Sequence, residues 1–308
     1  MKLLQSATKP VMTRLPPPSK AYPPGSPQLG GHKAAKKHCE IRERSVENVY
    51  IYDLIPKSSS AKTAEASGEK TSKQLYYFAG GSWRMPPSKE HWALCAELAR
   101  QLPDTQVSIV SHPLAPNSPA PDTFPQLLKM YRTLLRSAAL ANEEVILAGD
   151  SSGGEIILCL AGNAIPGDPD APAPAALVAI CPSVDLRQSN IQQMDIEPND
   201  PILRIVCSRD HADKWRGEWT SVDSRINPLY IDWEPVARKG VRVHGVLAGN
   251  DILRPDALKL RDMLVEAGVK GEWLDWDKQM HGFPLTFTYG LEDGKEAKNW
   301  IVDVLRRS

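Results

Sequence analysis

From about residue 75 onward, short apolar runs alternate with segments in which apolar residues recur at helical spacing. This alternation predicts parallel strands joined by crossover helices, because a helix is the usual connection that returns the chain to the start of the next strand. Strands are predicted over 41–55, 75–80, 106–112, 143–150, 176–183, 241–249 and 271–277. Helices are predicted over 88–102 (with Ser88 as the N-cap), 123–138, 155–164, 255–268 and 292–307. The expected fold class is α/β, a mostly parallel sheet with helices on both faces.

Three segments fall outside this alternation. Residues 1–38 are rich in Pro, Gly and Lys, which indicates an irregular arm or part of a lid over the core. Residues 57–73 are polar and weakly patterned, so they are predicted to form an exposed loop. Residues 185–240 are mixed in pattern and rich in Trp. The chain is long enough to bury one sizeable core.

The bulk composition excludes several classes of protein. The 308 residues contain 37 basic and 37 acidic side chains, and this balance argues against a nucleic-acid partner, which usually leaves a basic excess. The first apolar run is too short for a secretory signal, and no stretch reaches membrane-spanning length. The 5 cysteines are widely spaced without a CxxC pair, so we expect no zinc site and a reducing compartment. We therefore predict a cytoplasmic protein; the basic arm leaves an organelle transit peptide as the alternative.

The segment Gly149-Asp150-Ser151-Ser152-Gly153 fits the pattern G-x-S-x-G at the junction of a buried strand and a helix. At such a junction the serine lies on a sharp turn, so that its hydroxyl points out of the sheet. Side chains at 149 and 153 would collide with the neighbouring strand or helix, which explains the two glycines. The following helix directs its N-terminal amides toward the same point. We predict that Ser151 is a nucleophile; the alternative is a turn that only binds an anion or packs tightly.

A serine nucleophile in this setting needs a histidine base and an acid that orients it, in the chain order serine, acid, histidine. His281 follows a predicted strand in a loop, where a general base is expected. His244 lies inside an apolar strand, and His211 lies among charged residues that indicate the surface. Asp251 is the first carboxylate after the strand that ends near residue 249, and Asp256 falls inside the next helix. The predicted triad is Ser151, Asp251 and His281.

The loop Ala79-Gly80-Gly81-Ser82-Trp83 follows the strand at 75–78. A tetrahedral intermediate needs backbone N–H donors beside the nucleophile, and glycines allow the backbone to approach the substrate. We predict that the amides of Gly81, Ser82 and Ser152 form an oxyanion hole. An ordinary tight turn is the alternative interpretation of this loop.

Several motifs together resemble the hormone-sensitive-lipase-like branch of the α/β-hydrolases. Residues 149–154 resemble that family's GDSAGG, 79–83 its HGGGW, and 113–116 its YRLAP; residues 227–230, 249–253 and 281–283 resemble its SPLYA, GxDPL and HGF. Ala79 and Ser82 depart from the family's loop histidine and third glycine. The resemblance implies an α/β-hydrolase fold with an eight-stranded sheet in residues 41–308 and a cap formed by the arm, residues 1–40, and an insertion near 185–235.

The resemblance and the predicted triad together imply a serine carboxylesterase that needs no metal or organic cofactor. We expect a small hydrophobic ester as substrate, such as an acetylated secondary metabolite, and a monomer or homodimer. Trp83, Tyr230 and Phe283 are the candidate pocket residues, together with Trp215 and Trp219. Three alternatives stay open: a formamidase or amidase with the same triad, a thioesterase or cyclase that releases a product, and a non-catalytic receptor, which His281 disfavours.

Overall fold

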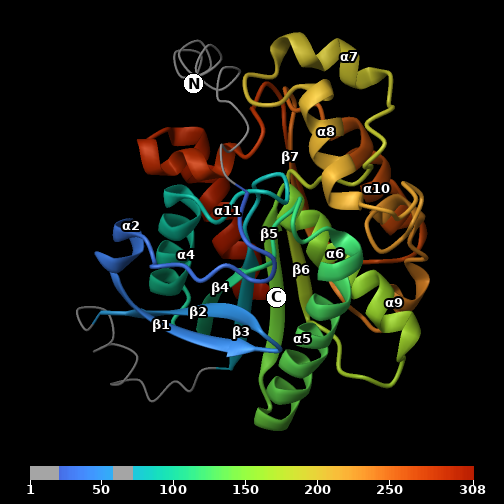
Figure 1. Ribbon diagram of the computed structural model, residues 1–308. Coiled ribbons are helices and arrows are strands. Elements are labelled where there is room, and N and C mark those ends of the chain that lie inside the picture. The colour runs from blue at the N-terminus through green and yellow to red at the C-terminus, as the bar shows by residue number, and fades with distance from the viewer. Residues whose placement is uncertain (1–20, 58–71) are drawn as a thin grey trace.

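A computed structural model describes residues 21–57 and 72–308 of the chain. Its centre is one eight-stranded sheet in the order β1-β2-β4-β3-β5-β6-β7-β8 (Figure 1). The first two strands and β2 with β4 pair antiparallel, and all later neighbours pair parallel. The strands are β1 Cys39–Val46, β2 Val49–Pro56, β3 Lys73–Phe78, β4 Thr105–Ser111, β5 Glu144–Asp150, β6 Ala176–Ile180, β7 Arg242–Ala248 and β8 Trp273–Trp276. The predicted fold class, a mostly parallel sheet, is confirmed.

Helices cover both faces of this sheet, because its central strands are apolar on both sides. In β3, Tyr76 and Phe78 join one buried cluster while Leu75 and Tyr77 join another. The first cluster packs under α5 (Ala120–Ala141), α6 (Ser152–Gly167), α9 (Glu234–Arg238) and α10 (Arg254–Glu266), and the second under α2 (Lys33–Lys36), α4 (Lys89–Gln101) and α11 (Glu292–Arg307). In Figure 1 the two groups lie on opposite sides of the strands. Ser88 caps α4 as predicted, since its side chain accepts a hydrogen bond from the Glu90 amide.

The strand signal over 41–55 is confirmed, but it covers two strands that the sequence pattern did not separate. The structure has an antiparallel hairpin there, in which β1 and β2 are joined by Glu47 and Asn48. Both residues have positive φ, 51° and 61°. Two left-handed residues in succession form the tight turn whose twist matches a hairpin, and Asn-Gly or Asp-Gly is its usual signal. Because Glu-Asn lacks the glycine, the sequence pattern gave no sign of the turn.

The chain between β6 and β7 contains most of the structure that does not belong to the sheet and its covering helices. It comprises α7 (Gln192–Ile196), the 3₁₀ turn η1 (Glu197–Asn199), α8 (Ile205–Arg216) and the 3₁₀ turn η2 (Pro228–Tyr230), and it ends with α9. We call residues 181–241 the inserted segment. Figure 1 shows α7 and α8 together at one end of the sheet.

The arm predicted over 1–40 falls partly outside the described residues, since these begin at 21. Residues 21–32 are irregular as expected, and hydrogen bonds tie them to the body: Ser26 Oγ donates to Ser111 O at 2.6 Å, and the Leu29 amide donates to Tyr52 Oη. Of the predicted loop at 57–73, residues 58–71 lie outside the described residues. No helix within the described ranges has the length and apolar character needed to cross a membrane.

Candidate active site

Ser151 lies at the tip of a strained turn between β5 and α6. Its φ of 51° and ψ of −120° are unusual for a residue with a side chain. The turn is held by the neighbouring strand, because the Ser151 amide donates to Ile180 O at 2.9 Å. A Cβ on Gly153 would come within 2.0 Å of the Phe78 carbonyl oxygen, and one on Gly149 within 2.7 Å of Gly153. The steric reason for the two glycines is therefore confirmed.

Asp251 and His281 meet at the same edge of the sheet, in the loops after β7 and β8. Nδ1 of His281 lies 2.7 Å from Asp251 Oδ2, and a carboxylate can only accept, so Nδ1 carries the proton. The other oxygen, Oδ1, accepts the Leu253 amide at 2.9 Å, which fixes the carboxylate. This leaves Nε2 of His281 as the nitrogen available to take a proton from a nucleophile.

The described residues contain no hydrogen bond between Ser151 and His281. Ser151 follows β5 and His281 follows β8, so both side chains belong to loops at the carboxyl ends of parallel strands. In unliganded sites the bond between nucleophile and base is often long or misaligned, and it tightens when substrate binds. The structure thus brings two of the three predicted triad residues into contact and places the third at the same edge.

Charges around His281 favour its protonated form. Burial alone would lower the pKa of His281, but the charge of Asp251 and its hydrogen bond raise that pKa to about 9. Asp200 adds to this effect. Asp200 is fully buried, and burial together with the Asp251 charge raises the pKa of Asp200 to about 6. Its carboxylate accepts the Ile252 amide at 3.0 Å, so it also ties the inserted segment to the loop that carries Asp251. No sequence motif marks Asp200, so its place beside Asp251 and His281 was not predicted.

The predicted oxyanion loop is fastened to the turn at Ser151. The Gly80 amide donates to Asp150 Oδ1 at 2.9 Å, and the Trp83 amide donates to Ser152 Oγ at 3.2 Å. Gly81 has φ 145° and Ser82 has φ 53°, so the loop turns sharply where its amides are needed. Ser152 is the first residue of α6, and its amide has no acceptor within the helix.

Asp150 is the anchor of this loop. Besides the Gly80 amide it accepts Tyr77 Oη at 2.8 Å, and its Oδ2 lies 3.1 Å from His91 Nε2. Burial opposes its charge, yet His91 and these hydrogen bonds lower the pKa of Asp150. The ring of His112 adds a further contact, with Nε2 3.4 Å from Ala79 O. The loop is therefore held without the histidine that the family has at position 79.

The indole N–H of Trp83 is hydrogen-bonded to a buried acid. Glu155, in the first turn of α6, is fully buried, and its Oε2 accepts the Trp83 indole N–H at 2.9 Å. Burial raises the pKa of Glu155 to about 8. The Trp83 ring stacks on Trp215 of α8, with ring centroids 6.0 Å apart and planes 9° apart. Glu155 thus links the helix after Ser151 to the oxyanion loop and the inserted segment.

A narrow cavity opens onto Ser151. Its free space is only about enough for one water molecule, so a substrate group that enters it must be small. Its other lining residues are Ser82, Trp83, Ser183, Gln188, Leu203, Ser208, His211 and Leu253. Of the predicted pocket residues, Trp83 lines this cavity. Phe283 is fully buried and packs edge-on against Trp276, and Tyr230 is 40% exposed and lies under the Arg187 guanidinium.

The expected surface position of His211 is wrong, since His211 is half-buried and lines the cavity with Ser151. Its spacing of four from Trp215 puts both on one helix face, and this signal was available in the sequence. Cys181, which follows β6, was also missed as a neighbour of the site. Its Sγ and the ligand atoms of Asp251 and His281 lie within 4.8 Å of one another, a spacing that could suit a metal ion. However, the His281 Nδ1 proton already engages Asp251.

A serine lies on a strained turn after β5, and an Asp–His pair follows β7 and β8. In this sheet, that is the arrangement found in the α/β-hydrolases. A family model described as α/β hydrolase fold matches residues 75–285. Esterase LipU of Mycobacterium tuberculosis is 28% identical over 73% of this chain and 76% of its own, and LipR of the same organism is 33% identical over 74% and 70%. Among solved structures, EstE5 soaked with ethyl alcohol has a TM-score of 0.79 at 19% identity over 99% of this chain and 97% of its own.

A hormone-sensitive lipase from a metagenome library has a TM-score of 0.74 at 21% identity over 98% of this chain and 89% of its own. At sequence identities this low, the likeness to the solved structures shows a shared fold and nothing more. The chain belongs to the α/β-hydrolase family, in the hormone-sensitive-lipase-like branch that its motifs indicate. It is an esterase, a carboxylic ester hydrolase.

Proposed function

We propose that the protein hydrolyses a small hydrophobic ester with a short acyl group, such as acetyl, by two-step acyl transfer. The contact between His281 and Asp251, at the same sheet edge as the strained Ser151, is the observation that carries this proposal. Trp83, Leu203 and Leu253 supply an apolar lining beside the serine, and the small cavity limits the size of the group that fits.

In the first step His281 Nε2 takes the Ser151 hydroxyl proton as Oγ attacks the ester carbonyl. The backbone N–H groups of Gly81, Ser82 and Ser152 donate to the developing oxyanion. Asp251 keeps the imidazole in the correct tautomer and stabilises the imidazolium. His281 then protonates the leaving alcohol. In the second step water, activated by His281, hydrolyses the acyl-enzyme and releases the acid. Apart from the ester and water, these steps use side chains and backbone groups of this chain.

The inserted segment would act as a cap over this site, as expected for residues near 185–235, and the arm would contribute to it. The 5 cysteines are free, and 4 of them are buried, which supports a cytoplasmic location, where thiols stay reduced. A formamidase, amidase or thioesterase would use the same side chains, so the choice of an ester rests on the relatives that are named esterases.

The test is the Ser151→Ala variant, with Ser137→Ala, an exposed serine on α5, as the matched control. We expect Ser151→Ala to lower kcat on 4-nitrophenyl acetate by about 10⁴-fold or more with unchanged thermal stability, and to abolish labelling by a fluorophosphonate probe. Ser137→Ala should keep both. Wild-type activity in Ser151→Ala would refute the assignment, and faster turnover of N-formylkynurenine than of every ester tested would favour the formamidase.

A further inference from the structure

The cavity at Ser151 has a polar wall that the acyl-transfer steps do not use. Gln188, Ser208 and His211 form this wall. We propose that these three side chains bind a hydroxyl group of the substrate close to the scissile ester, so that the preferred substrate is a small hydroxylated ester. This inference rests on the proposed function of Ser151 and deepens it by naming a substrate class.

The helix α8 itself directs two of these side chains into the cavity. Ser208, His211 and Trp215 are spaced by three and four residues, so they share one face of the helix. Trp215 is 1% exposed and stacks on Trp83, which fixes that face toward the site. Val206 is 72% exposed and points away from it. The polar pair Ser208 and His211 is therefore the part of α8 that any substrate at Ser151 meets.

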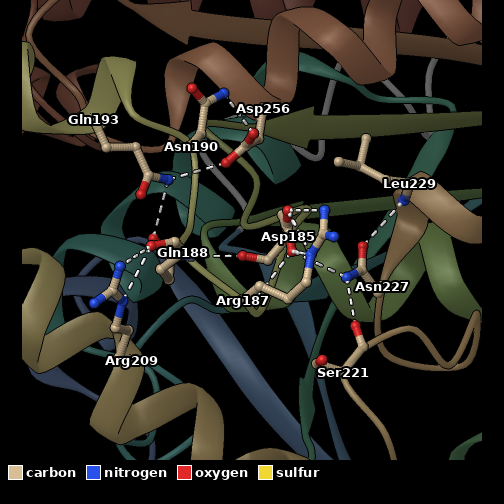
Figure 2. A network of polar contacts seen from close by, with 10 residues as sticks. All are labelled: Asp185, Arg187, Gln188, Asn190, Gln193, Arg209, Ser221, Asn227, Leu229 and Asp256. Atoms are coloured by element: carbon tan, nitrogen blue, oxygen red, sulfur yellow. Dashed lines mark hydrogen bonds and ion pairs between the residues drawn. The ribbon is translucent and has the colours of Figure 1, made fainter.

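Gln188 is held in place by a dense network of polar contacts (Figure 2). Its backbone has a φ of 47°, a strained value for a residue with a side chain. Its Nε2 donates to Asp185 O at 2.9 Å, and its Oε1 accepts Gln193 Nε2 at 3.3 Å. Its carbonyl oxygen accepts two hydrogen bonds from the Arg209 guanidinium, at 3.1 and 2.7 Å. The Gln188 amide is thus both buried and fixed in orientation before substrate arrives.

Part of the hydrogen-bonding capacity of this wall stays unused. An amide has two N–H donors and two acceptor positions, and within the described residues Gln188 uses one of each in its side chain. The Ser208 hydroxyl and the His211 ring make no hydrogen bond to any described residue. Burial and the Arg84 charge lower the pKa of His211, so at pH 7 its ring is neutral and offers one donor and one acceptor.

A hydroxyl group, which both donates and accepts, complements such a wall. An alkyl group in the same place would displace water from these polar atoms without replacing its hydrogen bonds, and this costs affinity. Sites built to bind a hydroxyl discriminate strongly against the analogue that lacks it for the same reason. The apolar lining from Leu203 and Leu253 would contact the rest of the small substrate.

The experiment measures kcat/KM on two matched pairs of esters. Ethyl butanoate and ethyl 3-hydroxybutanoate place the hydroxyl on the acyl side, and propyl acetate and 2,3-dihydroxypropyl acetate place it on the alcohol side. We expect the wild type to prefer the hydroxylated member of one pair by about 10-fold or more, and the pair that shows this identifies the side. A preference for the plain ester, or none, in both pairs overturns the proposal.

The variants Ser208→Ala and His211→Leu should each lower that preference by about 5-fold, as expected for one lost hydrogen bond. Val206→Ala, on the outer side of α8, is the matched control and should keep the preference. An unchanged preference in both variants overturns the role of these residues. If plain esters are cleaved through Ser151 without any preference, only this inference fails; if no ester is cleaved through Ser151, the proposed function fails with it.

Discussion

The buried carboxyl group of Glu155 should make the stability of the protein depend on pH. Burial raises the pKa of Glu155 from 4.5 to about 8. Below pH 4.5 the group is protonated in both the folded and the unfolded chain. Between pH 4.5 and 8 the unfolded chain releases the proton while the folded chain keeps it, so stability falls as the pH rises. The gap of about 3.5 pH units corresponds to a loss of about 5 kcal/mol, at about 1.4 kcal/mol per unit.

Glu155→Gln removes the titrating group and keeps an oxygen that can accept the Trp83 indole N–H. The free energy of unfolding, from urea titrations followed by tryptophan fluorescence, should be compared between variant and wild type from pH 5 to pH 9. The difference should shift in favour of the variant by about 4 to 5 kcal/mol across this range. Glu292→Gln, at an exposed position in the first turn of α11, should show no such shift. A difference for Glu155→Gln that stays constant within about 1 kcal/mol would refute a neutral buried acid.

Three further outcomes are expected. Gly153→Ala should destabilise the fold by more than about 3 kcal/mol, because its Cβ would lie 2.0 Å from Phe78 O; thermal unfolding tests this, and an unchanged melting temperature would contradict the steric argument. Asp251→Asn should lower kcat by about 10⁴-fold at neutral pH, since the imidazole loses the acceptor that fixes its tautomer; steady-state kinetics with a short aryl ester measures it. The raised pKa of His281, about 9, predicts that kcat/KM increases as the pH rises above 6.5, because the base must be neutral to take a proton; a profile already flat at pH 6.5 would argue against it.

The sheet was predictable because its signals are local. The apolar runs at 106–112 and 143–150 match β4 and β5 to within one residue at each end, and the closing helix over 292–307 matches α11. The hairpin of β1 and β2 was not predicted, because its turn residues Glu47 and Asn48 take left-handed conformations that the residue pair Glu-Asn does not indicate.

The residues of the site also fall into two groups, those that the sequence could predict and those that it could not. Ser151, Asp251 and His281 could be named from motifs and chain order, because a sharp turn with two glycines and loops at strand ends leave a trace in the sequence. Their catalytic roles stay a prediction. Phe283 lies in the core and Tyr230 lies at the surface, because an aromatic residue in a sequence does not reveal which side of a loop it faces.

The sequence by itself determined the α/β class, the turn at Ser151 and the order of the polar residues at the strand ends, because periodicity and steric clashes act between near neighbours in the chain. Only the tertiary structure decided which residues surround the serine. Glu155 becomes a buried acid because Trp83 covers it, and His211 faces the cavity because Trp215 turns α8 inward. These contacts join segments more than sixty residues apart, and burial and electrostatics are properties of such contacts rather than of the local sequence.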